Sequence, residues 1–215
     1  MVDQINVLCE IGNIELLKCL LNDCELFDIH NNKEHPCRIA CINGHMDIVC
    51  FLMETSENYS NRKIDIHIHD EIIFKCACMS GNLKLVKFLI NSAFDYSGKS
   101  IDIHSNNDSA FTWACRYGHK HIAQYLIELT YIYYGKINIH SHDEYAFRWT
   151  CDNGHLKITR WLIKLSYNYS NKKIDIYAIK NSAYKWAYIN GNYDVICYLK
   201  SIGCYNKYHT GIIIL

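Results

Sequence analysis

Residues 114–119 read Ala-Cys-Arg-Tyr-Gly-His, and segments of this general form recur along the 215-residue chain. In each segment a short apolar run precedes a glycine and a longer apolar run follows it. Successive glycines are 32, 37, 37, 36 and 37 residues apart, at Gly12, Gly44, Gly81, Gly118, Gly154 and Gly191. Self-similarity with a period of about 20 to 50 residues is the signature of repeat architectures. The sequence therefore predicts six repeating units that cover nearly the whole chain.

The spacing of apolar residues around each glycine predicts two helices per unit. After the glycine the spacing is that of an amphipathic helix, as in Leu83, Leu85, Val86, Leu89 and Ile90. Before the glycine lies a shorter run, such as Ala110, Phe111, Trp113, Ala114 and Cys115, which predicts an inner helix. Because glycine adopts left-handed backbone geometry readily, it can end the first helix and turn the chain into the second.

A third segment closes each unit. Ile64-Asp65-Ile66-His67 alternates β-branched and polar residues, and close copies begin at Phe27, Ile101, Ile137 and Ile174. Such alternation favours a short extended arm. The residues before these arms, such as Asn58-Tyr59-Ser60-Asn61, have the composition of exposed connecting loops.

Residues 35–45 read His-Pro-Cys-Arg-Ile-Ala-Cys-Ile-Asn-Gly-His and resemble the Thr-Pro-Leu-His-Leu-Ala-Ala-x-x-Gly-His pattern of ankyrin repeats. Pro36 falls on the family's proline, where the first turn of a helix tolerates a missing N–H. The resemblance implies an all-α ankyrin-repeat solenoid of about six helix-turn-helix units with β-hairpin-like arms. It further implies a single domain over residues 1–215, with approximate repeats 1–34, 35–71, 72–108, 109–144, 145–181 and 182–215.

The chain departs from the family pattern at two positions. The histidine of the family's first helix is replaced by Arg38, Lys75, Thr112, Arg148 and Lys185. The hairpin glycine is replaced by Lys33, Asp70, Asn107, Asp143 and Lys180, of which Asn and Asp tolerate left-handed geometry better than Lys does. The longer units, with their Ile-Asp-Ile-His and Phe-x-Trp-x-Cys segments, look like the ankyrin proteins of giant amoeba-infecting DNA viruses.

Composition argues against several classes of protein. Lys plus Arg and Asp plus Glu each number 22, so no net field favours nucleic acid or an anionic membrane. The first residues contain no secretory signal and no window has about 18 uninterrupted apolar residues. We therefore expect a cytoplasmic protein, in the host cytoplasm if it is viral, whose twelve cysteines are free thiols.

Residues that suggest chemistry are better explained by the repeat. Cys9, Cys41, Cys78, Cys115 and Cys151 occupy one repeat position, which favours core packing over a metal site. His67-x-His69 and His140-x-His142 lack a third ligand at fixed spacing, so no metal and no cofactor are expected.

Two further sets of equivalent residues lead to separate expectations. His30, His67, His104 and His140 suggest a ladder along one edge, with binding that depends on pH. Aromatic residues recur at equivalent positions of the predicted inner helices, which favours a core between repeats over a surface on which bases stack. These residues are Phe111, Trp113, Phe147, Trp149, Tyr184 and Trp186.

Function is therefore predicted to lie in protein binding, without enzymatic activity, because no catalytic motif is visible and repeat stacks present extended surfaces. The expected contact residues, on the arms and at the ends of the inner helices, are His69, Glu71, Met79, Ser80, Asn106, Asp108, Arg116, Tyr117, His142, Glu144, Asp152, Asn153, Ile189 and Asn190. Arg116 and Tyr117 are the preferred centre, because Arg and Tyr dominate interface energetics. The alternative is a structural or self-associating repeat protein with no separate ligand, in which self-association would use the apolar tail, Gly211 to Leu215.

Overall fold

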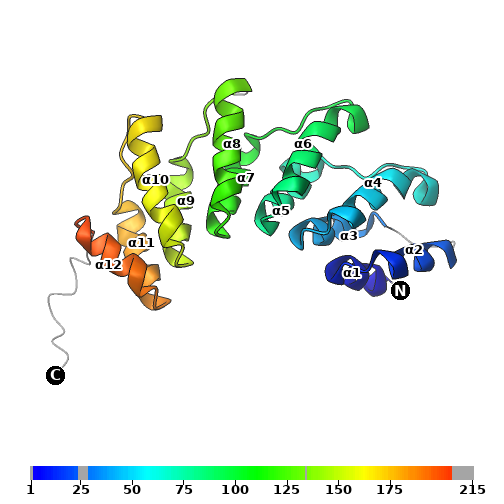
Figure 1. The fold of residues 1–215 in the computed structure, drawn as a ribbon, viewed down its shortest axis with the longest axis horizontal. Coiled ribbons are helices and arrows are strands. Elements are labelled where there is room, and N and C mark those ends of the chain that lie inside the picture. The colour runs from blue at the N-terminus through cyan, green and yellow to red at the C-terminus, as the bar shows by residue number, and fades with distance from the viewer. Residues whose placement is uncertain (1, 24–28, 134, 205–215) are drawn as a thin grey trace. The chain divides into compact units, whose positions relative to one another are not determined.

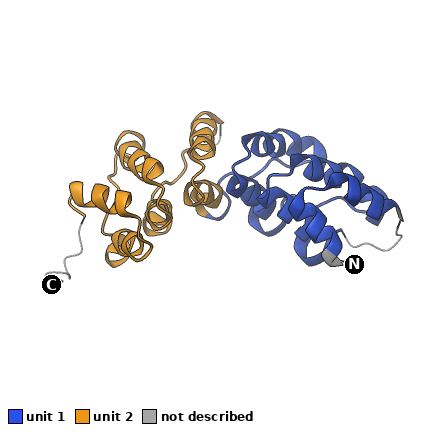
Figure 2. Cartoon of the chain, turned by 60° about the horizontal axis from the view of Figure 1, so that its bottom comes forward, with its two compact units in different colours: residues 1–106 blue, residues 107–215 orange. Residues whose placement is uncertain are grey.

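The structure is a computed structural model that describes residues 2–23, 29–133 and 135–204. These residues form helices and connecting turns, without a strand, and the chain divides into two compact units, residues 1–106 and 107–215 (Figure 2). The helices are α1 (Val2–Ile11), α2 (Ile14–Asp23), α3 (Asn31–Ile42), α4 (Met46–Ser60), α5 (Ile68–Ser80), α6 (Leu83–Ser97), α7 (Ser105–Arg116), α8 (Lys120–Tyr133), α9 (Ser141–Asp152), α10 (Leu156–Tyr169), α11 (Ala178–Ile189) and α12 (Tyr193–Ser201). The predicted all-α architecture of repeated helix-turn-helix pairs is confirmed (Figure 1).

Within each unit the helices stack in register. In the first unit the inner helices α1, α3 and α5 contact one another in order, and the outer helix α2 contacts α4. In the second unit α9 contacts α11, and the outer helix α10 contacts α12. Within each unit, the repeats that these helices form thus cover the apolar faces of one another, as expected for a repeat protein.

The repeated cysteines lie in the interior. Cys9, Cys41, Cys78, Cys115 and Cys151 are all fully buried, which confirms the core-packing interpretation. Burial raises the pKa of the Cys9 thiol to about 12 and the pKa values of Cys78, Cys115 and Cys151 still further. These thiols are therefore unreactive packing residues rather than nucleophiles or metal ligands.

The arms differ from the expected extended hairpins, because each closes with one left-handed helical turn. Three consecutive residues in each turn have φ between 43° and 65°: 32–34, 69–71, 106–108, 142–144 and 179–181. The turn in α9 is closed by the Glu144 N–H donating to the His140 carbonyl, at 3.3 Å. The residues at the missing hairpin glycines lie inside these turns. Left-handed geometry costs an ordinary residue roughly 1–2 kcal/mol, so other contacts must hold the turns.

A three-residue bridge holds each of three turns. In the second unit, His140 Nδ1 lies 2.9 Å from Glu144 Oε1, and His140 Nε2 lies 2.8 Å from Ser170 Oγ. Glu144 Oε1 also accepts a hydrogen bond from the N–H of Asp175, which belongs to the next arm, at 3.1 Å. We call this arrangement the Ser-His-Glu bridge. It recurs in the first unit as Ser60-His30-Glu34 and Ser97-His67-Glu71.

These bridges correct the expectation of an exposed histidine ladder. The side chains of His30, His67 and His140 are 2%, 18% and 8% exposed, and each contacts a glutamate and a serine. The segments taken as exposed loops are also partly helical, because α4 continues to Ser60 and α10 to Tyr169. This extension of the outer helix brings the serine of each bridge to its histidine.

Candidate functional site

The ends of the inner helices α7 and α9 are fixed by the following repeat. His155 Nε2 donates to the carbonyl of Arg116, at 2.9 Å, across the turn at Gly118. Gly118 has φ +86°, and a Cβ there would lie 2.9 Å from His155 Cε1, so a side chain would strain the backbone and displace the imidazole. Asn192 makes the equivalent contact with the carbonyls of Cys151 and Asp152. The last residues of α7 and α9 are therefore held in defined positions.

The inner helices of the second unit carry three tryptophans that are not fully buried. Trp113, Trp149 and Trp186 each lie five residues before a turn glycine, so they are repeat equivalents. Trp113 and Trp149 are half-buried and Trp186 is 51% exposed. The predicted core position is wrong for Trp186 and is met only in part by Trp113 and Trp149, whereas Phe111, Phe147 and Tyr184 are buried as expected. Each tryptophan follows one of these buried residues by two positions. Residues two apart on a helix point to different sides, so the tryptophans do not share the buried side.

Arg116 fills the space between two of these tryptophans. Its guanidinium carbon lies 3.5 Å from the ring centroid of Trp149 and 5.5 Å from that of Trp113. Tyr117 stacks on Trp113, with ring centroids 5.9 Å apart and planes 7° apart. A guanidinium over an indole face is favoured by the negative face of the ring. Arg116, Tyr117, Trp113 and Trp149 therefore form one ordered cluster at the surface.

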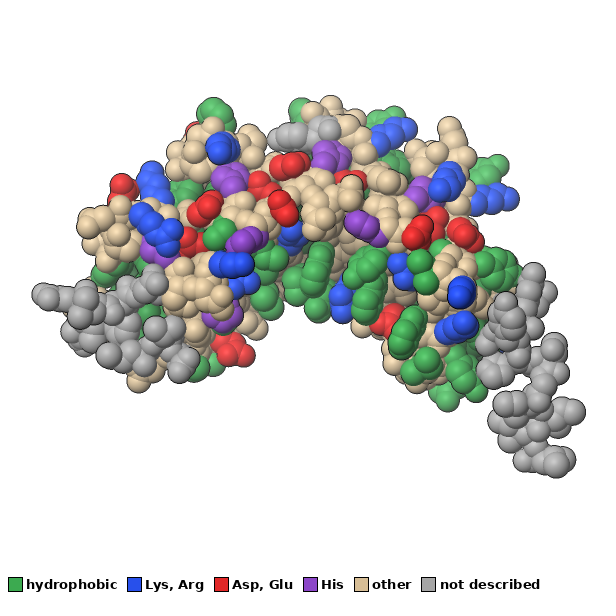
Figure 3. Space-filling view, turned by 180° about the vertical axis from the view of Figure 1, so that it is seen from behind, with side chains coloured by type: hydrophobic (Ala, Val, Ile, Leu, Met, Phe, Trp, Pro, Cys, Tyr) green, Lys and Arg blue, Asp and Glu red, His purple; other side chains and the backbone are tan. Residues whose placement is uncertain are grey.

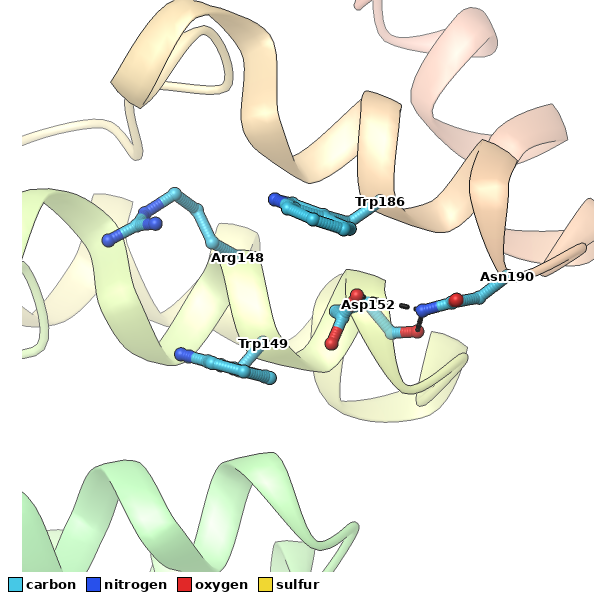
Figure 4. A pocket seen from close by; sticks show the side chains of 5 residues that line it. All are labelled: Arg148, Trp149, Asp152, Trp186 and Asn190. Carbon is cyan, nitrogen blue, oxygen red and sulfur yellow. Dashed lines mark hydrogen bonds between the residues drawn. The ribbon is translucent and has the colours of Figure 1, made fainter.

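A pocket of about 280 Å³ lies next to this cluster, lined by Arg148, Trp149, Asp152, Trp186 and Asn190 (Figure 4). Asn190 Nδ2 donates to Asp152 Oδ1 at 2.8 Å and to the Asp152 carbonyl at 3.1 Å, which joins α11 to the end of α9. Burial raises the pKa of the Asp152 carboxyl, against the opposing effects of Arg116 and Asn190. Two indoles and one carboxylate thus surround an open space.

Comparison with known proteins gives a family for part of the chain. Residues 57–140 match the family model described as ankyrin repeats, in three copies. This part of the chain is similar to ankyrin repeats. None of the curated proteins matches the chain. Ankyrin repeats are generally protein-protein interaction modules, and the expected all-α ankyrin-repeat architecture is confirmed.

Several contact residues predicted for the ankyrin repeats meet at this surface. Arg116, Tyr117, Asp152 and Asn190 lie in the tryptophan cluster or the pocket. Asn153 and Ile189 are also exposed at ends of inner helices, and His142 is exposed on a left-handed turn. In the first unit His69 and Asn106 are exposed on their turns, and Met79 and Ser80 are half-buried at the end of α5.

Three predicted contact residues are corrected. Glu71, Asp108 and Glu144 are 6%, 5% and 3% exposed. Their carboxylates accept hydrogen bonds from backbone N–H groups of the next arm, namely those of Asp102, Asn138 and Asp175. A carboxylate used inside the fold in this way cannot present itself to a partner. These three residues therefore stabilise the stack rather than a binding surface.

Sequence reasoning missed that Trp149, Trp186 and Arg148 line a pocket at the surface. Arg148 occupies the position of the family's helix histidine and donates from Nε and Nη2 to the carbonyls of Asp143 and His142. It therefore braces the left-handed turn of its own repeat. The accessibility of the tryptophans could have been predicted from their position. Each follows a buried Phe or Tyr by two residues and therefore lies on a different side of the helix.

Neither a metal site nor a membrane-spanning helix is found among the residues that the structure describes. No group of three or more His, Cys, Asp or Glu residues there could hold a metal ion. Among the same residues, no helix is both long enough and apolar enough to cross a membrane. The proposed self-association tail, Gly211 to Leu215, lies outside the described residues.

Proposed function

We propose that this protein is a non-enzymatic adapter that binds a protein partner, with the tryptophan cluster and pocket of residues 107–204 as its main contact surface. The observation that carries the proposal is the cluster that Arg116 forms with the half-buried Trp113 and Trp149 and the exposed Tyr117, next to a pocket lined by the exposed Trp186. Interfaces are enriched in Trp, Tyr and Arg, and a few such residues dominate binding energy. Burying a surface of this kind therefore gives more free energy than burying an average polar surface.

The charge of the protein suits a protein partner better than a nucleic acid. Figure 3 shows one face of the molecule, on which Lys and Arg side chains are interspersed with Asp, Glu, His and hydrophobic side chains. A nucleic-acid surface concentrates positive charge to neutralise phosphates. The mixed charges, together with the ankyrin repeats, support a protein partner.

The proposed setting follows from the resemblance to ankyrin proteins of giant amoeba-infecting DNA viruses. In that setting the protein engages host proteins in the host cytoplasm. A second candidate function is self-association through the apolar tail, residues 211–215. Light scattering at rising protein concentration distinguishes the two, because self-association increases the measured mass without any added partner.

The test compares capture of proteins from a cell lysate by three forms of the chain. Trp186→Ala removes an aromatic side chain from the proposed surface, and Tyr193→Ala removes one that is 74% exposed at the start of α12. We expect quantitative mass spectrometry to find a partner that wild type and Tyr193→Ala retain and Trp186→Ala loses. The proposal fails if every captured protein is retained equally by both variants.

A further inference from the structure

The repeat itself provides an internal comparison for the pocket. Arg116 lies two residues before Gly118, and Asp152 lies two residues before Gly154, so the two residues are equivalent. The same equivalence relates the pair Trp113 and Trp149 to the pair Trp149 and Trp186. The chain therefore contains two consecutive spaces between inner-helix tryptophans, which we call slot 1 and slot 2 in chain order.

Slot 1 is occupied by the protein's own guanidinium. The Arg116 guanidinium carbon is 3.5 Å from the centroid of Trp149 and 5.5 Å from that of Trp113. The first distance is that of direct stacking on the indole face. Slot 1 therefore shows what kind of group these tryptophans accommodate.

Slot 2 lies between the equivalent tryptophans, Trp149 and Trp186. The residue equivalent to Arg116 is Asp152, so that position supplies no cation to slot 2. Asp152 replaces the arginine, and its shorter side chain leaves the pocket of about 280 Å³. Asp152 Oδ1 is held by Asn190, so the carboxylate is fixed at the edge of the space (Figure 4). A carboxylate beside an aromatic slot favours a cationic guest and can accept hydrogen bonds from a guanidinium.

Arg148 also lines slot 2 and must be considered as a competing cation. Its Nε and Nη2 donate to the carbonyls of Asp143 and His142, at 2.8 and 2.9 Å. Its guanidinium carbon lies 5.6 Å from the ring centroid of Tyr145. In Figure 4 the guanidinium points away from the two indoles. Arg148 therefore contributes its aliphatic stem to the slot and leaves the indole faces open.

We propose that slot 2 binds the guanidinium of an arginine side chain from a protein partner, stacked between Trp149 and Trp186 and paired with Asp152. That the arginine comes from a partner protein rests on the proposed function. That slot 2 binds a guanidinium does not depend on it. The guest would repeat in slot 2 the arrangement that Arg116 makes in slot 1. A planar neutral group such as a nucleobase could stack on the indoles but would not need the carboxylate.

The test uses a small probe, N-acetyl-L-argininamide, followed by the indole N–H signals in proton-nitrogen NMR spectra of the full chain. Trp→Phe variants assign the signals. We expect saturable shifts at Trp149 and Trp186, with affinity in the millimolar range or weaker because one side chain is bound. Trp161 on α10 serves as an internal reference. The neutral isostere N-acetyl-L-citrullinamide should bind at least about fivefold more weakly.

Two substitutions at one position separate charge from occupancy. Asp152→Asn removes the charge, and we expect about fivefold weaker binding of the probe. Asp152→Arg should fill slot 2 as Arg116 fills slot 1 and abolish the shifts. Glu128→Gln, an exposed charge on α8, is the matched control and should leave binding unchanged.

Three outcomes overturn the inference: equal binding of the citrulline probe, unchanged binding to Asp152→Arg, or preferential binding of adenosine monophosphate. These outcomes are independent of the lysate test. If Trp186→Ala loses a partner while the arginine probe fails to bind, the inference falls and the proposed function stands. If the probe binds and no partner depends on Trp186, the proposed function falls and the slot stands.

Discussion

His140 Nδ1 lies 2.9 Å from Glu144 Oε1, four residues further along the chain and on the other side of a left-handed turn. The glutamate side chain is only 3% exposed and also accepts the N–H of Asp175 from the next arm. One buried carboxylate thus stabilises a strained turn and joins two successive repeats. Burying a carboxylate is costly, and these hydrogen bonds offset that cost.

The first prediction concerns this carboxylate. Glu144→Gln should lower the free energy of unfolding by about 1–3 kcal/mol, because it weakens hydrogen bonds to a buried charged group. Asp143→Asn is the matched control, since it removes the same charge from an exposed residue in the same turn. Urea unfolding followed by circular dichroism measures both variants. Equal stabilities for the two would show that the bridge does not hold the stack.

The second prediction concerns backbone strain in the last left-handed turn. Ile179 has φ +51° and is 52% exposed, whereas the equivalent positions carry Asn or His. A β-branched residue is poorly suited to left-handed geometry, and asparagine tolerates it. Ile179→Asn should therefore raise the free energy of unfolding by about 1 kcal/mol. Ile189→Asn, at an exposed helical position, should give no such gain in the same urea experiment.

The helices could be predicted from the sequence, but the turns could not. The apolar spacing around Leu85 and Val86 determines an amphipathic helix by itself, and both residues are buried as that spacing requires. The left-handed turn at Glu144 depends instead on Ser170 and Asp175, about 30 residues away. Local sequence alone favours an extended arm there, and the distant contacts override that preference.

The candidate site was predictable only in part, for a related reason. Arg116 and Tyr117 differ from their equivalents in other repeats, and variation within a repeat marked them as surface residues. Trp149 and Trp186 follow the repeat, so their pattern resembled that of core residues such as Phe147. Their exposure depends on which side of the inner helix faces the next repeat, and that is a property of the stacked structure.

The third prediction concerns pH. Burial lowers the pKa of His155, against the opposing effect of its hydrogen bond to the Arg116 carbonyl. Between this lowered pKa and the ordinary histidine value of about 6.5, the unfolded chain binds a proton that the folded chain does not. The stability that His155 contributes is therefore complete above about pH 6.5 and falls as the pH decreases toward the lowered pKa.

His155→Asn tests this assignment, because asparagine already occupies the equivalent positions Asn82 and Asn192 and donates to the same kind of carbonyl there. The variant should keep the hydrogen bond and lose the titration. Stability should be measured by urea unfolding at several pH values between 5 and 8. We expect the variant to gain stability relative to wild type as the pH falls below about 6.5. A difference between the two proteins that stays constant with pH would exclude His155 as the titrating group.

The fourth prediction concerns slot 1, which a single substitution should convert into the arrangement of slot 2. Arg116→Asp should open slot 1 and give it the carboxylate that slot 2 already has. N-acetyl-L-argininamide should then shift the indole signal of Trp113, which the wild-type protein protects with its own guanidinium. Arg116→Ala opens the space without the charge and should bind the probe about fivefold more weakly than Arg116→Asp. If the Trp113 signal responds equally in wild type and Arg116→Asp, Arg116 does not occupy slot 1 in solution, and the analogy that assigns arginine to slot 2 is lost.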